Sequence, residues 1–384
     1  MTISAGSRHS MAYMLEATYG TTPATPTFKA LRHKATTLSL TKQTFTSAEL
    51  RADRQIADFR HGTKEVHGDI NVELSNGAFN DFFQAAMLGT WAARSTMTAS
   101  TISAASADNS FNDSANGFVT AGFVAGDTLS TSSFTTGANN SAVAVVVSVT
   151  SAKIIVTGPT LVTEAAGSPR TVASNAQMLV TGTTRRSFTI ERNFSDIVQF
   201  QRYTGCEFDK FSLSVKPEGI VDCTFSVLGQ GQSGGVSILS GATYPAATTG
   251  SPFDGFSGTI TEGGTTIALV TDVKLDLVNG LNPLFVVGSA QTIQPSIGRS
   301  NVTGTVTAFF QDAALINKFI NETASALSFT VGDGTNTMTF TCPRIKYTGA
   351  PPNVAGEGPI VLAMPFQAIL DPVSGTNIQI VRSV

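Results

Sequence analysis

The sequence is poor in charged residues, in cysteine and in long apolar runs. Only 13% of its 384 residues are charged, against about 25% in a typical soluble domain. The formal net charge is −3, which argues against a protein that grips nucleic-acid phosphates, because such proteins carry a basic excess. No apolar stretch approaches the ~18 residues of a membrane-spanning helix, and the N-terminal MTISAGSRHS lacks the apolar region of a secretory signal.

Cysteine is also scarce. The three cysteines, Cys206, Cys223 and Cys342, are odd in number and lack metal-site spacing. This pattern favours synthesis in a reduced, cytosolic compartment.

Glycine, by contrast, is abundant, with 35 residues, and Ser, Thr, Ala and Val fill short alternating runs. Such alternation is typical of strands with one buried face. The sequence therefore predicts a mainly β protein, and its length is sufficient for more than one core.

The stretch VHGDINVELSNGAFNDFFQ, residues 66–84, predicts a strand that leads into a short helix. Side chains alternate along a strand, so its apolar residues share one face. The polar residues on the other face are His67, Asp69, Asn71 and Glu73. Asn76 stands where a helix N-cap belongs, and Gly89 is placed to end the helix.

A second stretch, VTGTVTAFFQDAALINKFI from Val302, lies over the first without a gap, with Val302 on Val66 and Phe319 on Phe83. Asp312 can cap its helix. TTLSLT (36–41) likewise matches TDVKLDL (271–277), SFTI (187–190) matches SFTV (328–331), and EGIVDCTF from residue 218 matches EGPIVLAMPF from residue 357. The common order of these matches predicts an internal repeat.

The repeat sets the predicted domain boundaries. Copy one spans 28–91 plus 183–230, and copy two spans 265–372. Residues 92–182 read as a small β domain inserted at a helix-to-strand loop, where insertions are best tolerated. The remaining segments are an N-terminal arm (1–27), a linker (231–264) and a C-terminal tail (373–384). We expect the arm to be extended and to become ordered only by lying on a neighbouring subunit.

Catalysis and metal binding find little support. The histidines, at positions 9, 33, 61 and 67, have no cysteine nearby, and a metal site needs convergent ligands. Asp69 and Glu73 would lie about 13 Å apart along a strand, too far for the paired carboxylates of glycosidases. GQGQSG (229–234) matches a dinucleotide fingerprint, but no helix follows it, so a flexible linker explains these glycines better. We expect no enzyme activity, no metal and no cofactor.

One segment, ELRADRQIADFRHGTKE (49–65), concentrates charge of both signs. It reads either as a solvated loop or as an interface loop in which alternating signs fix the register with a neighbouring subunit. Its candidate contact residues are Glu49, Arg51, Asp53, Arg54, Asp58 and Arg60. The second copy has the almost uncharged NPLFVVGSAQTIQPSIG instead.

YMLEATYGTTPATPTFKAL (13–31) and SAELRADRQIADFRHGTKEVHGDINVELSNGAFNDFFQAAMLGTW (47–91) resemble the major tail tube protein of long-tailed bacteriophages, in a duplicated-domain form. The resemblance is strongest over residues 11–91. It implies two tandem β-sandwich or barrel domains, each with a short flanking helix, beside the inserted β domain. It also implies a structural virion protein that polymerises as stacked rings into a hollow tube for genome ejection.

The same resemblance implies partners and a channel wall. The partners would be further copies of the chain, other tail proteins at the two tube ends, and phage DNA that passes without specific binding; no membrane segment is expected. The protein would be made in the host cytoplasm and reside in the virion tail. Two copies per chain predict a homotrimeric, pseudo-hexameric ring, and the N-terminal arm would contact the adjacent ring. The predicted channel-lining residues are His67, Asp69, Asn71, Glu73, Asp272, Lys274, Asp276, Thr303, Thr305 and Thr307, a net negative set.

Two other classes share this composition. A β-rich decoration or receptor-binding protein would not form tubes, and a tail-associated glycan hydrolase would need clustered carboxylates and aromatic platforms. The chain has one tryptophan and five tyrosines, which weakens the hydrolase alternative.

Overall fold

The computed structural model describes residues 3–141, 143–255, 258–267, 269–349, 352–354 and 356–383. The protein is mainly β, with 49% of residues in strands and 6% in helices, as the sequence predicts. The chain divides into two compact units. Unit 1 comprises residues 1–90, 181–335 and 341–378, and unit 2 comprises 91–180, 336–340 and 379–384.

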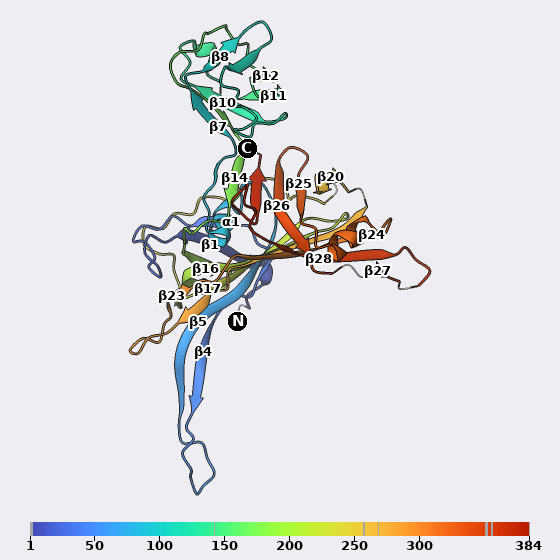
Figure 1. The fold of residues 1–384 in the computed structure, drawn as a ribbon. Helices are drawn as coiled ribbons and strands as arrows, with labels where there is room; N and C mark the ends of the chain where they lie inside the picture. Colours follow the sequence, from blue (N-terminus) through green and yellow to red (C-terminus); the bar gives the residue numbers. More distant parts are fainter. Residues whose placement is uncertain are drawn as a thin grey trace. The chain divides into compact units, whose positions relative to one another are not determined.

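The main sheet of unit 1 is antiparallel throughout, and several of its strands are labelled in Figure 1. Its strands follow the order β4 (Ser39–Thr46), β5 (Phe59–Glu73), β17 (Asp222–Gly229), β16 (Gln199–Val215), β21 (Val270–Val278), β24 (Asn301–Phe309), β28 (Val361–Ala368) and β26 (Thr337–Tyr347). β3 (Ala35–Thr36) also pairs with β5, and β27 (Pro352–Asn353) with β28. The two halves of this sheet have the same order of pairing, and β16 with β21 joins them.

One face of this sheet is apolar from β5 to β26. The registers align one row across seven strands: Ile70, Phe225, Phe211, Leu277, Val302, Ala368 and Ile345. Every member of the row is at most 4% exposed. This side therefore forms the core, because burying apolar area is the main stabilising term.

Helix α1 (Asn80–Met87) covers part of the apolar face. Phe82 and Phe83 are fully buried. The Phe82 ring lies 4.4 Å from that of Phe208 and 4.7 Å from that of Tyr13, and the Phe83 ring lies 5.3 Å from that of Phe225, measured between centroids. The apolar face of the first half thus packs under this helix.

A second layer of strands completes unit 1. β1 (His9–Leu15) pairs with β2 (Lys29–Leu31) and with β15 (Phe188–Phe194), and β15 pairs with the first part of β16. β18 (Gly231–Gly235) pairs with the same part of β16. In the second half, β25 (Ser325–Gly332) pairs with β19 (Ile260–Glu262), which pairs with β20 (Thr265–Thr266).

Three smaller elements complete the list for unit 1: the 3-10 turn Gly6–Arg8, the hairpin of β22 (Asn282–Leu284) and β23 (Ile293–Ser296), and helix α2 (Ala314–Ile320). None of the α2 residues is buried. Asp312 accepts a hydrogen bond from the Ala314 amide at 2.8 Å, but the N-cap residue is Ala313, one position after the predicted cap.

Unit 2 has its own seven-stranded sheet and core. The strand order is β7 (Thr96–Ala99), β13 (Arg170–Ser174), β10 (Thr128–Ser132), β11 (Ala144–Val149), β12 (Lys153–Thr157), β9 (Ser110–Asp113) and β8 (Ile102–Ala105). A 3-10 turn (Gly137–Asn139) follows β10. β14 (Gln177–Val180) pairs with β6 (Ala92–Ala93) and with β29 (Gln379–Arg382), where Arg382 lies 5.2 Å from the Trp91 ring centroid.

The N-terminal segment differs from expectation. The prediction that the arm becomes ordered only against a neighbouring subunit is wrong for His9–Leu15, because this segment pairs with β15 of its own chain. The sequence pattern did not reveal this strand, because Met11 through Met14 are all buried. A strand covered on both faces shows no alternation of apolar and polar residues.

Two helix ends also differ. α1 begins at Asn80 and not directly after Asn76, because Gly77 takes a left-handed φ of 75° that a helix cannot continue through. The left-handed residue that ends α1 is Leu88, with φ 53°, and not Gly89.

The flexible linker expected at GQGQSG is likewise wrong, since Gly231–Gly235 form β18. Further along the predicted linker, Phe253 is fully buried and bonded through its backbone to Leu74 and Val221.

Candidate functional site

The polar face of the main sheet gathers the residues that the sequence singled out. The ten predicted positions lie on three strands of one sheet: His67, Asp69, Asn71 and Glu73 on β5, Asp272, Lys274 and Asp276 on β21, and Thr303, Thr305 and Thr307 on β24. Their registers alternate with the apolar rows, so these side chains share the opposite face.

Two polar rows cross most of the sheet. One row is Asn71, Thr224, Ser212, Asp276, Thr303, Gln367 and Lys346, and the other is Glu73, Asp222, Ser214, Lys274, Thr305 and Pro365. The sequence reading missed the contributions of β16 and β17. Their alternation in DKFSLSV and DCTFSVL was the available signal.

Hydrogen bonds between neighbouring strands fix these polar side chains. Thr224 Oγ1 donates to Asn71 Oδ1 at 2.8 Å, and Ser226 Oγ donates to Asp69 Oδ1 at 2.7 Å. The Ser212 hydroxyl donates to Asp276. Cross-strand pairs of this kind each stabilise a sheet by roughly 0.2–1 kcal/mol.

The charge on this face is more nearly balanced than the ten predicted residues suggest. Those ten contain four carboxylates and one lysine. The rows add the carboxylate of Asp222 and the amine of Lys346. Lys210, which lies outside the two rows on β16, adds a second lysine, with its Nζ 3.0 Å from Asp276 Oδ1. Lys274 Nζ is 3.8 Å from Asp272. The negative excess of the face is therefore two charges and not three.

Both ends of the sheet present open edges. Within the described residues, β4 pairs with β5 alone and β27 with β28 alone. An open edge offers unpaired N–H and C=O groups that another strand can bind.

The charged segment forms the far part of the β4–β5 hairpin, which is long and narrow (Figure 1). Its predicted contact residues are all exposed: Glu49, Arg51, Asp53, Arg54, Asp58 and Arg60. Arg51 pairs with Asp53 at 2.7 Å and Arg60 with Asp58 at 3.1 Å. Exposed pairs between such close neighbours contribute little to stability.

Apolar side chains on the same hairpin are exposed as well. Leu50 is 100% and Ile56 is 71% exposed, and Phe45 and Phe59 are more than half exposed. Clustered apolar exposure of this kind marks a contact surface.

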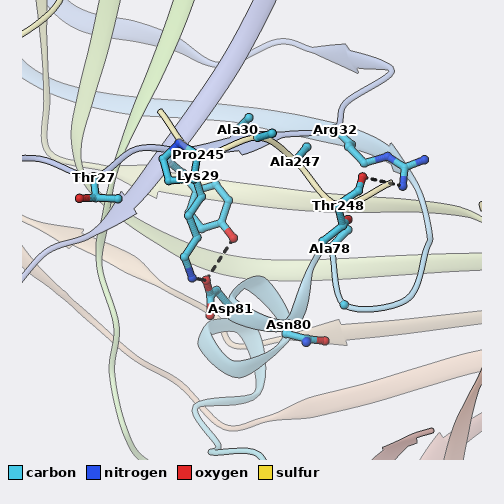
Figure 2. A pocket seen from close by; sticks show the side chains of 13 residues that line it. Thr27, Lys29, Ala30, Arg32, Ala78, Asn80, Asp81, Pro245, Ala247 and Thr248 are labelled. Carbon is cyan, nitrogen blue, oxygen red and sulfur yellow. Dashed lines mark hydrogen bonds and ion pairs between the residues drawn. The ribbon is translucent and has the colours of Figure 1, made fainter. Parts of the chain in front are cut away.

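A cavity of about 390 Å³ lies beside the start of α1. Figure 2 shows Lys29 and Asp81 meeting across it, with Nζ 2.7 Å from the carboxylate. Tyr13 donates to the same carboxylate at 3.1 Å, and Arg32 donates to the Gly250 carbonyl at 2.6 Å. Burial, followed by the charge of Asp81, raises the pKa of Tyr13. Of the residues that line the cavity, Asp81 alone carries a carboxylate, and it is already paired with Lys29. The lining therefore offers neither a pair of carboxylates nor a nucleophile beside a general base.

Among the described residues, neither the cysteines nor the other metal-binding residue types are grouped into a site. Cys206, Cys223 and Cys342 are free and buried, and burial raises the pKa of the Cys342 thiol to about 12. In the described part of the chain, no three His, Cys, Asp or Glu side chains are grouped to hold a metal. Neither of the helices that the structure describes has the length and apolar character to cross a membrane.

The chain was compared with curated proteins and with models of protein families. No curated protein matches the chain. A family model described as phage tail tube protein matches residues 6–368, nearly the whole chain. Proteins of this family are structural tail proteins, and a sheet with one polar face and open edges is consistent with that role. Because the match covers nearly the whole chain, the chain belongs to the phage tail tube protein family.

Proposed function

We propose that the chain polymerises as stacked rings into the hollow tail tube through which the phage genome is ejected. The observation that carries this proposal is the junction of β16 with β21, which joins two similarly ordered halves of one sheet inside a single chain. The same kind of junction between chains would pair the β26–β27 edge of one chain with the β3–β4 edge of the next. Closing the sheet into a barrel then leaves no open edge.

The two halves are proposed to be two copies of one tail tube domain. Gly68 and Gly304, aligned in the sequence repeat, support this. A Cβ at Gly68 would lie 2.4 Å from Leu38 Cα, and one at Gly304 would lie 2.4 Å from the Lys274 carbonyl oxygen. Both glycines thus allow a close approach of the preceding strand at the same place in each half. Residues 92–182 are the proposed insertion into copy one.

Three chains with two copies each give a pseudo-hexameric ring. A heterologous contact that repeats around a rotation axis closes into such a ring. The polar face would line the channel with the ten predicted residues, and their negative excess would repel DNA, which carries one charge per roughly 1.7 Å of axis. Such a wall allows the genome to slide without binding.

The exposed β4–β5 hairpin is proposed to contact the adjacent ring. Its apolar residues Leu50 and Ile56 would become buried there, and its alternating charges would fix the register. Other tail proteins would cap the two ends of the tube. The virion tail is the proposed location, after synthesis in the host cytoplasm, and no catalytic role is proposed.

Purified full-length protein tests the assembly. Native mass spectrometry should show rings of three chains, and negative-stain microscopy at high concentration should show hollow tubes. Rings of six full-length chains would overturn the trimer. A chain that remains monomeric under all conditions would favour a decoration or receptor-binding protein.

Charge reversal tests the channel. Replacing Asp69, Glu73, Asp272 and Asp276 by lysine should leave ring formation intact but slow genome ejection, with the strongest effect at low salt. The control is the replacement of Glu357, an exposed residue outside the polar rows, by lysine. Normal ejection by the fourfold variant across salt concentrations would contradict the electrostatic role of the wall.

A further inference from the structure

Two hairpins leave the main sheet at the same end, one from each half. The strand registers place the connection from β4 to β5 and the connection from β21 to β24, which contains the β22–β23 hairpin, at this end. The Lys64 amide of β5 donates to the Ala290 carbonyl of the β22–β23 hairpin at 2.8 Å. The two hairpins are therefore neighbours, and we name this the hairpin end of the sheet.

The tips of the two hairpins differ in chemistry. The β4–β5 tip, residues 47–58, concentrates charge of both signs. Residues 279–298, which contain the other hairpin, include no Asp, Glu, Lys or Arg. Phe285 and Val286 are exposed there, and Val287 is fully exposed. Residues 284–287 thus form an apolar tip, and clustered apolar exposure marks a contact surface.

The opposite end of the sheet is charged in the first half. It holds a hollow of about 480 Å³, lined by two lysines and three carboxylates among other residues. These charged residues, named here the charged hollow, are Lys34, Glu73, Lys216, Glu218 and Asp222. Lys34 and Asp222 form an exposed ion pair at 3.0 Å. Ile220 is the one large apolar side chain among the residues that line the hollow.

The same end is apolar in the second half. Phe309, the last residue of β24, is 40% exposed, and Phe310 and Leu269 are each 37% exposed. The Phe309 amide donates to the Leu269 carbonyl at 3.0 Å, so these three residues form one apolar patch. Helix α2, which begins four residues after Phe310, has no buried residue.

Stacked rings bring the hairpin end of one ring against the opposite end of the next. Each proposed ring alternates first and second halves, so two registers exist. In the crossed register the uncharged apolar tip enters the charged hollow and removes water from five charges without offering them a partner, which is costly. In the like register the apolar tip covers the apolar patch, which is favourable, and the charges of the β4–β5 tip meet those of the hollow.

We propose that successive rings stack in the like register. The apolar tip of one chain binds the apolar patch of a chain in the next ring, and the β4–β5 tip binds the charged hollow. The occupant of both surfaces is a second copy of the chain, identified by matching chemistry at the two ends of one sheet. The inference rests on the proposed tube and adds the surface that receives each hairpin. The cost of the crossed register selects the rotation between rings.

Cross-linking tests the register. The three native cysteines are buried, so a short bismaleimide reagent joins introduced, exposed cysteines. One variant carries Ser289→Cys, next to the apolar tip, with Gln311→Cys, next to the apolar patch. The matched variant carries Ser289→Cys with Pro217→Cys, next to the charged hollow. All three positions are exposed. The nine residues of β24 alone separate the two ends of the sheet by about 26 Å, so a short reagent links chains of different rings.

The two variants should give different products. Tubes of the 289/311 variant should yield covalent ladders of chains on a denaturing gel, whereas tubes of the 289/217 variant should yield mainly unlinked chains. If tubes form but the 289/217 variant cross-links equally or better, or neither variant cross-links, the like register is overturned and the proposed tube stands.

A single substitution tests the apolar tip. Val287→Asp should raise the protein concentration at which tubes form by about tenfold, while native mass spectrometry still shows rings and circular dichroism shows folded protein. Val143→Asp, at an exposed valine of unit 2, is the matched control and should form tubes normally. Unchanged tube formation by Val287→Asp would overturn the register, and an unmodified chain that forms no tubes would overturn both the register and the proposed function.

Discussion

Phe83 and Phe319 occupy aligned positions in the two helical stretches, but the structure places them in different surroundings. Phe83 is fully buried, with its ring centroid 5.4 Å from that of Phe211 and 5.3 Å from that of Phe225. Phe319 is 38% exposed. The same substitution at the two positions therefore measures how much more of the core the first helix carries.

The expected magnitudes follow from burial. Phe83→Ala removes a whole buried ring and leaves a cavity among packed aromatic side chains, which should lower the free energy of unfolding by about 3–5 kcal/mol. Phe319→Ala loses only part of the ~1.5–3 kcal/mol for burying such a side chain, and water fills the space. We expect a loss of about 1 kcal/mol there.

A urea titration of each full-length variant, followed by far-ultraviolet circular dichroism, measures the difference. Hydrogen exchange should also show faster opening of peptides from α1, β16 and β17 in Phe83→Ala and no such change in Phe319→Ala. Equal shifts of the urea midpoint for the two variants would refute the packing difference between α1 and α2.

Two further substitutions probe unit 1. Burial, and then the charge of Arg192, lowers the pKa of His9 to about 4. Between pH 6.5 and 4 the unfolded chain therefore binds a proton at His9 that the folded chain does not. The free energy of unfolding should fall as the pH falls through that window. Allowing for the partial exposure of the His9 ring, this loss of unfolding free energy is on the order of 1 kcal/mol. His9→Gln should flatten the dependence of melting temperature on pH. The control, His61→Gln on the exposed hairpin, should preserve that dependence. Arg202→Met should lower the free energy of unfolding by about 3 kcal/mol because it leaves the Glu191 carboxylate, 2.7 Å from Arg202 Nε, buried without its cation. Replacing Glu191 by leucine as well should recover most of that loss in the same denaturation assay, and no recovery would contradict the ion-pair account.

The sequence was informative wherever one face of an element is buried and the other is not. Alternation predicted the two faces of β5, β21 and β24, and the structure confirms a mainly β chain with those faces. It failed for β1, whose residues Met11 to Met14 are buried on both sides. Periodicity carries no signal when every side chain is covered.

Partners of the predicted residues were harder to predict, because they lie on strands distant in the sequence. Lys210 and Asp276 are 66 positions apart, yet 3.0 Å separates their charged atoms. Only the antiparallel pairing of β16 with β21 brings them together. Local pattern can tell which face a lysine occupies, but the neighbour that neutralises it depends on strand order.

Strand order also explains why the internal junction and the outer edges use different side chains. Inside the chain, β16 and β21 are held on one polypeptide, so their effective concentration is high. A hydrogen bond from an uncharged donor, such as that from Gln294 to the Glu207 carboxylate, is then sufficient. An edge that meets another chain must find its register by diffusion among many wrong encounters. Charges act at longer range than hydrogen bonds and disfavour mismatched pairing.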